Sequence, residues 1–203
     1  MKKDRVILFD LGRVLFDFDH LIAARKISKD CSLSEKEIYD LFFDSQLTDK
    51  YERGVVTSFD FYKEVKKILD IDIDYEGFIP IWNDIFFPVP GMLEVIESLK
   101  VRYPIYLASN TNELHFLHLE EQFPEYFRCF RYLFLSHQLG LRKPDPLIYN
   151  FIISYIKTDP GNIIYIDDRK ELVEPAKNLG IDAFVFHSVD SMKEELAKRN
   201  ILV

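Results

Sequence analysis

Four short segments of this sequence carry polar residues whose types and order suit phosphoryl chemistry. Three of them, residues 6–12, 106–110 and 163–168, are apolar runs that stop abruptly in polar groups, as buried parallel strands do when their ends carry a site. The fourth, residues 142–144, reads Arg-Lys-Pro. The polar side chains that these segments contribute are Asp10, Ser109, Asn110, Lys143, Asp167 and Asp168. Such a set can bind a metal ion, hold a phosphoryl group and attack it.

The first of these residues has the chemistry of a nucleophile. Asp10 can attack phosphorus and form an aspartyl-phosphate, which divides a difficult hydrolysis into two easier steps. Because two anions must then meet, the reaction needs a cation. Mg²⁺ prefers hard oxygen ligands, and Asp10, Asp168 and the backbone carbonyl of Gly12 can supply them.

The remaining polar groups suit phosphate binding. Ser109, Asn110 and neighbouring backbone N–H groups can donate hydrogen bonds to phosphoryl oxygens, and Lys143 can neutralise charge and hold Asp10 ionised. Each residue alone has an ordinary explanation, since an aspartate at a strand end is often a cap and a Lys-Pro pair is often a turn. Their occurrence together, in this order, favours a catalytic site.

The elements that must position these residues follow from the hydrophobic pattern. After residue 88, strand and helix patterns alternate, which predicts an α/β fold with a Rossmann-like, doubly wound parallel sheet. The expected strands are 6–9, 104–108, 132–135, 163–166 and 183–186, and the expected helices are 92–100, 114–122, 145–155, 172–179 and 191–199. Sites in such sheets lie beyond the carboxyl ends of the strands.

Residues 17–87 show a different pattern. Apolar residues recur at helical spacing over 21–27, 38–42 and 58–69, and 75–86 is a fourth, aromatic-rich candidate. Ser34 followed by Glu37 predicts a helix N-terminus with a capping box. We therefore predict an α/β core made of residues 1–16 and 88–203, with an inserted all-helical cap at 17–87.

The composition limits the class of protein. The 203 residues are 48% hydrophobic and 30% charged, with a formal net charge of −8. This acidic balance argues against a nucleic-acid or membrane-surface partner, and no stretch is long and apolar enough to span a bilayer. The two cysteines, Cys31 and Cys129, show no metal-ligand spacing and favour reduced thiols in a cytoplasmic protein.

The sequence resembles the haloacid dehalogenase superfamily in four strings: FDLGRVL (9–15), LASNT (107–111), LRKPDPLIY (141–149) and IDD (166–168). The resemblance extends over essentially the whole chain and includes the helical insertion. Within the superfamily, the sequence is similar to the small-cap branch, whose first motif reads D-L-G. This branch includes sugar-phosphate phosphatases of the glucose-1-phosphate type. The string Glu52-Arg53-Gly54 is also similar to that branch.

The resemblance implies a Mg²⁺-dependent phosphatase acting on a small phosphorylated metabolite. It implies that Asp10 is the nucleophile, that Ser109 and Lys143 bind the phosphoryl group, and that Asp168 binds Mg²⁺. Asp167 would orient either a metal-bound water or Lys143. Asn110 and the cap residue Glu52 are further candidates for substrate binding. Caps of this kind often dimerise, so a homodimer is a further expectation.

The sequence departs from the superfamily pattern at three positions. Gly12 stands where most phosphatases of the superfamily have an aspartate that works as general acid and base, a contribution worth about 10²–10⁴-fold. Arg13 replaces a small or amide residue, and Leu172 replaces a polar residue after the paired acids. The residues that can supply the missing proton are Glu52, Asp17, Asp19 and His20, although the last three are more typical of a solvated turn.

Two alternatives follow from the same residues. The first is a metal-independent hydrolase that releases halide from a 2-haloacid through an ester on Asp10. Asp168 speaks against it, because such enzymes do not need that metal ligand. The second is a protein that keeps the fold and binds phosphate or a partner with little turnover, as Gly12, Arg13 and Leu172 would allow.

Overall fold

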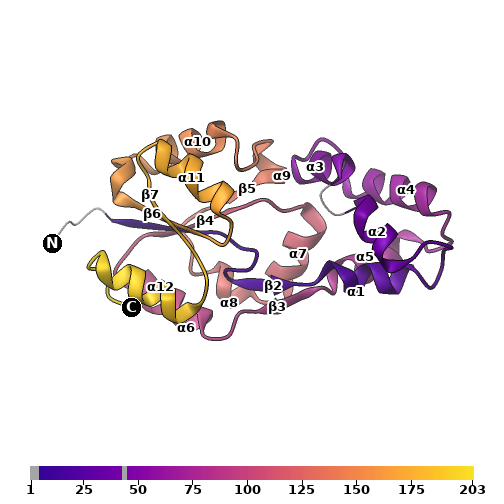
Figure 1. Cartoon of the computed structure of the whole chain (residues 1–203), viewed down its shortest axis with the longest axis horizontal. Helices are drawn as coiled ribbons and strands as arrows, with labels where there is room; N and C mark the ends of the chain where they lie inside the picture. The colour runs from indigo at the N-terminus through magenta and orange to yellow at the C-terminus, as the bar shows by residue number, and fades with distance from the viewer. Residues whose placement is uncertain (1–4, 43–44) are drawn as a thin grey trace.

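The computed structural model describes residues 5–42 and 45–203. Its main sheet has five parallel strands in the order β5-β4-β1-β6-β7 (Figure 1). These strands are β1 (Val6–Phe9), β4 (Ile105–Ser109), β5 (Leu133–Leu135), β6 (Ile163–Asp167) and β7 (Asp182–Val185). The expected α/β fold with a doubly wound parallel sheet is confirmed.

Helices cover both faces of this sheet, because successive residues of a strand point to opposite faces. In β1, Ile7 and Phe9 pack into one apolar cluster and Leu8 packs into another on the opposite face. The helices of the first face are α6 (Met92–Lys100), α7 (Glu113–Gln122), α8 (Pro124–Phe127) and α12 (Val189–Lys198). Those of the second face are α10 (Pro146–Ile156) and α11 (Lys170–Asn178). Burial on both faces explains why the strands read as continuous apolar runs.

A second group of helices lies at one end of the molecule and has its own apolar cluster (Figure 1). Its members among the described residues are α1 (His20–Ile27), α2 (Glu35–Phe42), α3 (Gln46–Glu52), α4 (Ser58–Leu69) and α5 (Tyr75–Asn83). The chain enters and leaves this group through β2 (Phe16–Phe18) and β3 (Phe86–Pro88), which pair antiparallel. The predicted boundaries at 16/17 and 87/88 run through this ribbon, and the division into two domains stays a prediction.

The structure corrects several element boundaries. The aromatic-rich helix ends at Asn83, because residues 86–88 form a strand. The last helix is capped by Ser188, whose hydroxyl accepts a hydrogen bond from the backbone N–H of Ser191, so its start lies before the predicted one. The sequence pattern did not predict α3, whose polar face lines the pocket described below. The capping box of Ser34 and Glu37 is present at the start of α2.

Two short elements complete the description. They are α9 (Ser136–Leu139), directly after β5, and the 3₁₀ helix η1 (Pro160–Asn162), directly before β6. Among the helices of the described residues, none has both the length and the apolar character that a membrane crossing requires.

Candidate active site

The candidate active site lies where the order of the sheet reverses. From β1 the chain builds β4 and β5 on one side and then returns to build β6 and β7 on the other. Asp10 follows β1 and donates its backbone N–H to the carbonyl of Ile166 in β6, at 2.8 Å. Asp167 is the last residue of β6. Topology therefore brings together side chains far apart in the sequence, at the position where such sheets bind ligands.

Lys143 joins the two strand ends. Its Nζ atom lies 2.7 Å from Oδ1 of Asp10 and 2.7 Å from Oδ2 of Asp167. All three residues are buried, with exposed fractions of 1% for Lys143, 7% for Asp10 and 0% for Asp167. Buried charges persist only when they are paired and hydrogen-bonded, and these contacts provide that pairing.

Burial and the neighbouring charges shift the pKa values of these side chains. Burial raises the pKa of Asp10 to about 7, and the Lys143 ammonium opposes this rise. Burial lowers the pKa of Lys143, but Asp10 and Asp167 outweigh that effect and keep it above its usual range. Burial and the neighbouring Asp167 raise the pKa of Asp168. One ammonium thus contacts two buried carboxylates, and the Lys143 and Arg13 cations oppose the rise in the pKa of Asp168.

The carboxylate of Asp167 has further partners. The Tyr165 hydroxyl donates a short hydrogen bond to Oδ2, and the backbone N–H of Arg169 donates to Oδ1 at 2.9 Å. Of the two roles considered for Asp167, its contact with Lys143 supports the orientation of that lysine. Sequence reasoning missed Tyr165, because a tyrosine in an apolar run reads as core.

Asp168 provides the third carboxylate. Oxygen atoms of Asp10, Asp167 and Asp168 all lie within 4.8 Å of one another, so the three side chains can reach a single cation. Asp10, Gly12 and Asp168 also line the same pocket. Hard oxygen donors at this spacing suit Mg²⁺ or a similar divalent cation.

Asn110 holds the lysine from the other side. Its amide nitrogen donates to the backbone carbonyl of Lys143 at 2.8 Å, and its amide oxygen accepts from the backbone N–H of Lys143 at 2.9 Å. Asn110 therefore fixes the main chain that carries the ammonium group, and it lines the pocket as well. Ser109 is buried at the end of β4. Its predicted contact with the phosphoryl group stays a prediction.

The pocket above these residues has a volume of about 440 Å³, is partly open and is lined by residues of both the core and the cap. The core contributes Asp10, Asp168, Lys143 and Arg142, and the cap contributes one face of α3 together with His20 and Trp82. A space of this size suits a small metabolite better than a folded protein.

His115, in α7, contributes a buried imidazole to the pocket wall. It is 6% exposed, and its Nε2 lies 3.1 Å from the carbonyl of Trp82. A carbonyl only accepts, so Nε2 carries the proton, and Nδ1 accepts from the amide of Asn112 at 3.0 Å. Burial lowers the pKa of His115 to about 3. His115 is therefore a neutral group of fixed orientation.

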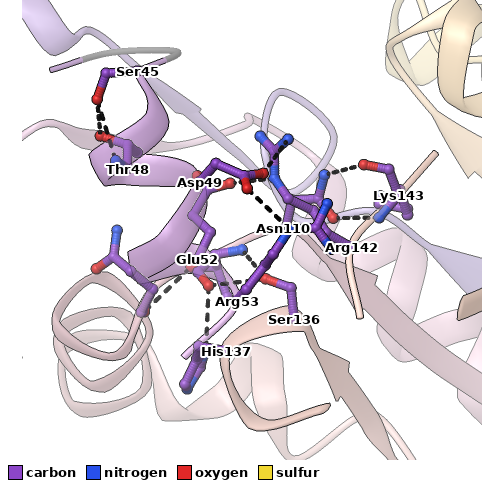
Figure 2. Close-up of polar contacts among 12 residues, drawn as sticks. Ser45, Thr48, Asp49, Glu52, Arg53, Asn110, Ser136, His137, Arg142 and Lys143 are labelled. Carbon is purple, nitrogen blue, oxygen red and sulfur yellow. Dashed lines mark hydrogen bonds and ion pairs between the residues drawn. The ribbon is translucent and has the colours of Figure 1, made fainter. Parts of the chain in front are cut away.

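Glu52 of the cap and Arg142 of the core form an ion pair in the pocket lining. Nε of Arg142 donates to Oε2 of Glu52 at 2.6 Å, and its Nη1 lies 3.4 Å from Oδ1 of Asp49 (Figure 2). Glu52 and Asp49 belong to α3 in the cap, whereas Arg142 immediately precedes Lys143. Sequence reasoning singled out Glu52 for a substrate or proton role and did not foresee this ion pair.

The turn after Asp10 contains Gly12 and Arg13, two of the residues that depart from the family pattern. Arg13 has a φ of 56°, a left-handed conformation, and its guanidinium lies 5.2 Å from the centre of the Phe18 ring. A Cβ atom at Gly12 would lie 2.9 Å from Cε1 of that ring. The ring of Phe18 therefore occupies the space into which a side chain at position 12 would extend.

The remaining acidic candidates have local roles. Asp19 caps α1 and accepts a hydrogen bond from the backbone N–H of Leu21, and Asp17 accepts one from Phe18. These contacts agree with the expectation of turn residues. His20 does line the pocket, where its ring stacks 6.5 Å from the ring of His115.

The fold and this site have the features of one enzyme family. The family model of haloacid dehalogenase-like hydrolases matches residues 5–180, and the chain belongs to that family. The match covers β1, the helical insertion, Lys143 and the paired acids at the end of β6.

Similar proteins include phosphatases and enzymes of known structure. The D-ribitol-5-phosphate phosphatase of Bacteroides thetaiotaomicron is 27% identical over 199 residues, which cover 94% of this chain and 95% of that protein. A crystal structure of the family enzyme bt-2542 from the same organism has a TM-score of 0.85 at 22% identity and covers 96% and 99% of the two chains. Its wild-type complex with magnesium and inorganic phosphate has a TM-score of 0.78 at 21% identity, with coverage of 91% and 95%.

Proposed function

We propose that this protein is a Mg²⁺-dependent phosphatase that hydrolyses a small phosphorylated metabolite through an aspartyl-phosphate on Asp10. The observation that carries the proposal is the contact of Lys143 with both Asp10 and Asp167, beside Asp168 and at a pocket lined by the core and the cap. Lys143 holds Oδ1 of Asp10, so Oδ2 is the oxygen available for attack. The phosphatase among the relatives supports the same class of reaction.

The residues present fit a divalent cation. Asp10, Asp168 and the carbonyl of Gly12 would hold Mg²⁺, which when bound neutralises the negative charge of the nucleophile and the phosphate. The grouping of Asp10, Asp167 and Asp168, whose oxygens lie within 4.8 Å of one another, supports this assignment. The related structure that contains magnesium and inorganic phosphate supports it further.

The reaction follows from the roles of these side chains. An oxygen of Asp10 forms a bond to phosphorus while the bond from phosphorus to the substrate oxygen breaks, and the leaving alkoxide takes up a proton. Water then attacks the aspartyl-phosphate, releases inorganic phosphate and restores the carboxylate. Throughout, Lys143 stabilises charge on the phosphoryl oxygens, with Ser109 and backbone N–H groups as further expected donors.

The pocket favours a hydroxylated metabolite as the leaving group. Its lining includes polar side chains such as Ser45, Asp49 and Arg13. Such groups form hydrogen bonds with hydroxyl groups of a sugar or polyol phosphate. The related D-ribitol-5-phosphate phosphatase acts on a substrate of this kind. A homodimer and a cytoplasmic location, both expected from the sequence, stay predictions.

Phosphate release from p-nitrophenyl phosphate tests the proposed reaction. We expect turnover with Mg²⁺ and loss of turnover in EDTA, and the variant Asp168→Asn should need more Mg²⁺ to reach half its maximal rate, because it loses a charged ligand. The variant Asp60→Asn, an exposed site on α4, is the matched control. Turnover that is indifferent to EDTA would contradict the metal dependence, whereas halide release from a 2-haloacid without phosphate release would point to the 2-haloacid hydrolase. Phosphate binding without turnover would point to the binding protein.

The missing general acid leads to a second prediction. Gly12→Asp alone must displace the Phe18 ring, whose nearest atom lies 2.9 Å from the added Cβ. Phe18→Leu removes that atom, and the next atom of the ring lies at 3.7 Å. In the Phe18→Leu background, Gly12→Asp should raise the rate for an alkyl phosphate relative to p-nitrophenyl phosphate by at least about 10-fold, because the poorer leaving group gains more from protonation.

The control for this change is Gly12→Asn in the same background, which has nearly the same volume and no acidic proton. The measurement is the ratio of kcat/KM values for the two substrates in each variant. An unchanged ratio with normal folding and Mg²⁺ affinity would mean that another group already protonates the leaving alkoxide.

A further inference from the structure

The string Glu52-Arg53-Gly54 forms a point of contact between the cap and the core. Ser45, Thr48, Asp49 and Glu52 line the pocket, so one face of α3 and its N-cap looks toward the catalytic residues. At the end of this helix Gly54 has a φ of +66°, and a Cβ atom there would lie 2.1 Å from the backbone carbonyl of His137 in α9. The backbone of the cap thus lies directly against the backbone of the core, and no larger residue fits.

Beside this contact, the Glu52–Arg142 ion pair connects the same helix to the residue before Lys143. The side chains of Arg142 and Glu52 are 22% and 17% exposed, and their 2.6 Å contact is partly shielded from solvent. Asp49 lies one turn earlier and is shared, because it contacts Arg142 at 3.4 Å and Arg53 at 3.0 Å. Partial burial makes such a pair worth more than one on an open surface.

On the other side of Arg142, the main chain of Lys143 is held by both groups of the Asn110 amide (Figure 2). Lys143 is therefore fixed in three ways: by Asn110 through its backbone, by two carboxylates through its ammonium group, and by the cap through the preceding residue. Only the third connection depends on where the cap stands.

We propose that Glu52 is a positioning residue that acts through Arg142: it holds α3 over the pocket and links the cap to the segment that carries Lys143. This inference rests on the proposed function, and it replaces direct substrate binding or proton donation as the role of Glu52. Oε2 of Glu52 already accepts a hydrogen bond from the Arg142 guanidinium at 2.6 Å, so the carboxylate is engaged with the core rather than with a substrate.

The test is a double-mutant cycle with the variants Glu52→Gln, Arg142→Gln and both together. We expect kcat/KM of Glu52→Gln to fall about 10-fold, as for a partly buried charge pair, and by the same factor for an alkyl phosphate and for p-nitrophenyl phosphate. In the Arg142→Gln background, Glu52→Gln should cause no further loss, because its partner is already gone. Glu64→Gln, the same change at an exposed position of α4, is the control and should leave both rates unchanged.

Two kinetic outcomes would overturn the proposal. A much larger loss with the alkyl phosphate would make Glu52 a proton donor. An equal loss with and without Arg142 would mean that Glu52 acts on the substrate directly.

Hydrogen exchange provides a readout that does not depend on phosphatase activity. Backbone amides of α3 should exchange faster in Glu52→Gln and in Arg142→Gln, while those of α4 keep their rates in all variants. If the wild-type protein hydrolyses no phosphate ester, the proposed function fails. Hydrogen exchange alone then tests whether Glu52 links the cap to the segment that carries Lys143. Unchanged exchange of α3 would then contradict the role of Glu52.

Discussion

Asp10→Asn is expected to abolish phosphate release while the protein keeps its fold. An amide cannot attack phosphorus, so turnover should fall by at least about 10³-fold. The amide oxygen still accepts the hydrogen bond from Lys143, and the change removes one of two like charges that lie beside it. Stability should therefore be unchanged or higher. Kinetics with p-nitrophenyl phosphate and thermal unfolding followed by circular dichroism measure the two effects.

The two measurements together make this prediction specific. A loss of activity with a lowered melting temperature would indicate damage to the fold rather than loss of a nucleophile. Activity above about a tenth of the wild-type value would show that Asp10 does not form the covalent intermediate, since loss of a nucleophile costs far more than that. Asp60→Asn provides the comparison for an exposed aspartate.

Lys143→Met should both inactivate and destabilise the protein. It removes the only cation that contacts Asp10 and Asp167 at hydrogen-bond distance among the described residues, and both carboxylates are buried. Removing one partner of a buried ion pair costs about 3–5 kcal/mol, because the remaining charges stay uncompensated. Urea unfolding in EDTA measures the loss without the contribution of a bound cation.

A second substitution separates lost charge from lost packing. In the Lys143→Met background, Asp167→Asn should restore at least about 1 kcal/mol of stability, because it removes one of the two unpaired carboxylates. Lys67→Met, at an exposed position of α4, should stay within about 0.5 kcal/mol of the wild type. If Asp167→Asn restored nothing, the effect of Lys143→Met would lie in packing of its long side chain.

The Phe18 ring leaves no space for an acidic side chain at position 12. The Phe18 ring fills the space beside Gly12, and the guanidinium of Arg13 lies over the same ring. Gly12, Arg13 and Phe18 are therefore in mutual contact, and a side chain at position 12 needs the space that Phe18 fills. For this reason the test of the general acid combines substitutions at positions 12 and 18.

Hydrophobic periodicity in the sequence was sufficient to determine the α/β fold. The strand at 6–9 was predicted to the residue, and the helix at 92–100 as well. Strands buried on both faces must be apolar throughout, and an amphipathic helix must repeat its apolar residues every three to four positions. Such patterns need no knowledge of the rest of the chain.

The sequence also placed the principal charged residues at strand ends. Asp10 and Asp167 were located because an apolar run that ends in a carboxylate is visible locally. Their convergence at one edge follows from parallel pairing, which the alternation of strands and helices predicts.

Only the tertiary structure decided which of these groups contact one another. Tyr165 lies in an apolar run, and its hydroxyl could not be assigned to Asp167 before the strand had a neighbour. His115 becomes a buried, neutral group because the cap lies against α7. The partner of Glu52 is 90 residues away in the sequence. Contacts of this range depend on how the cap packs on the core, which no local periodicity encodes.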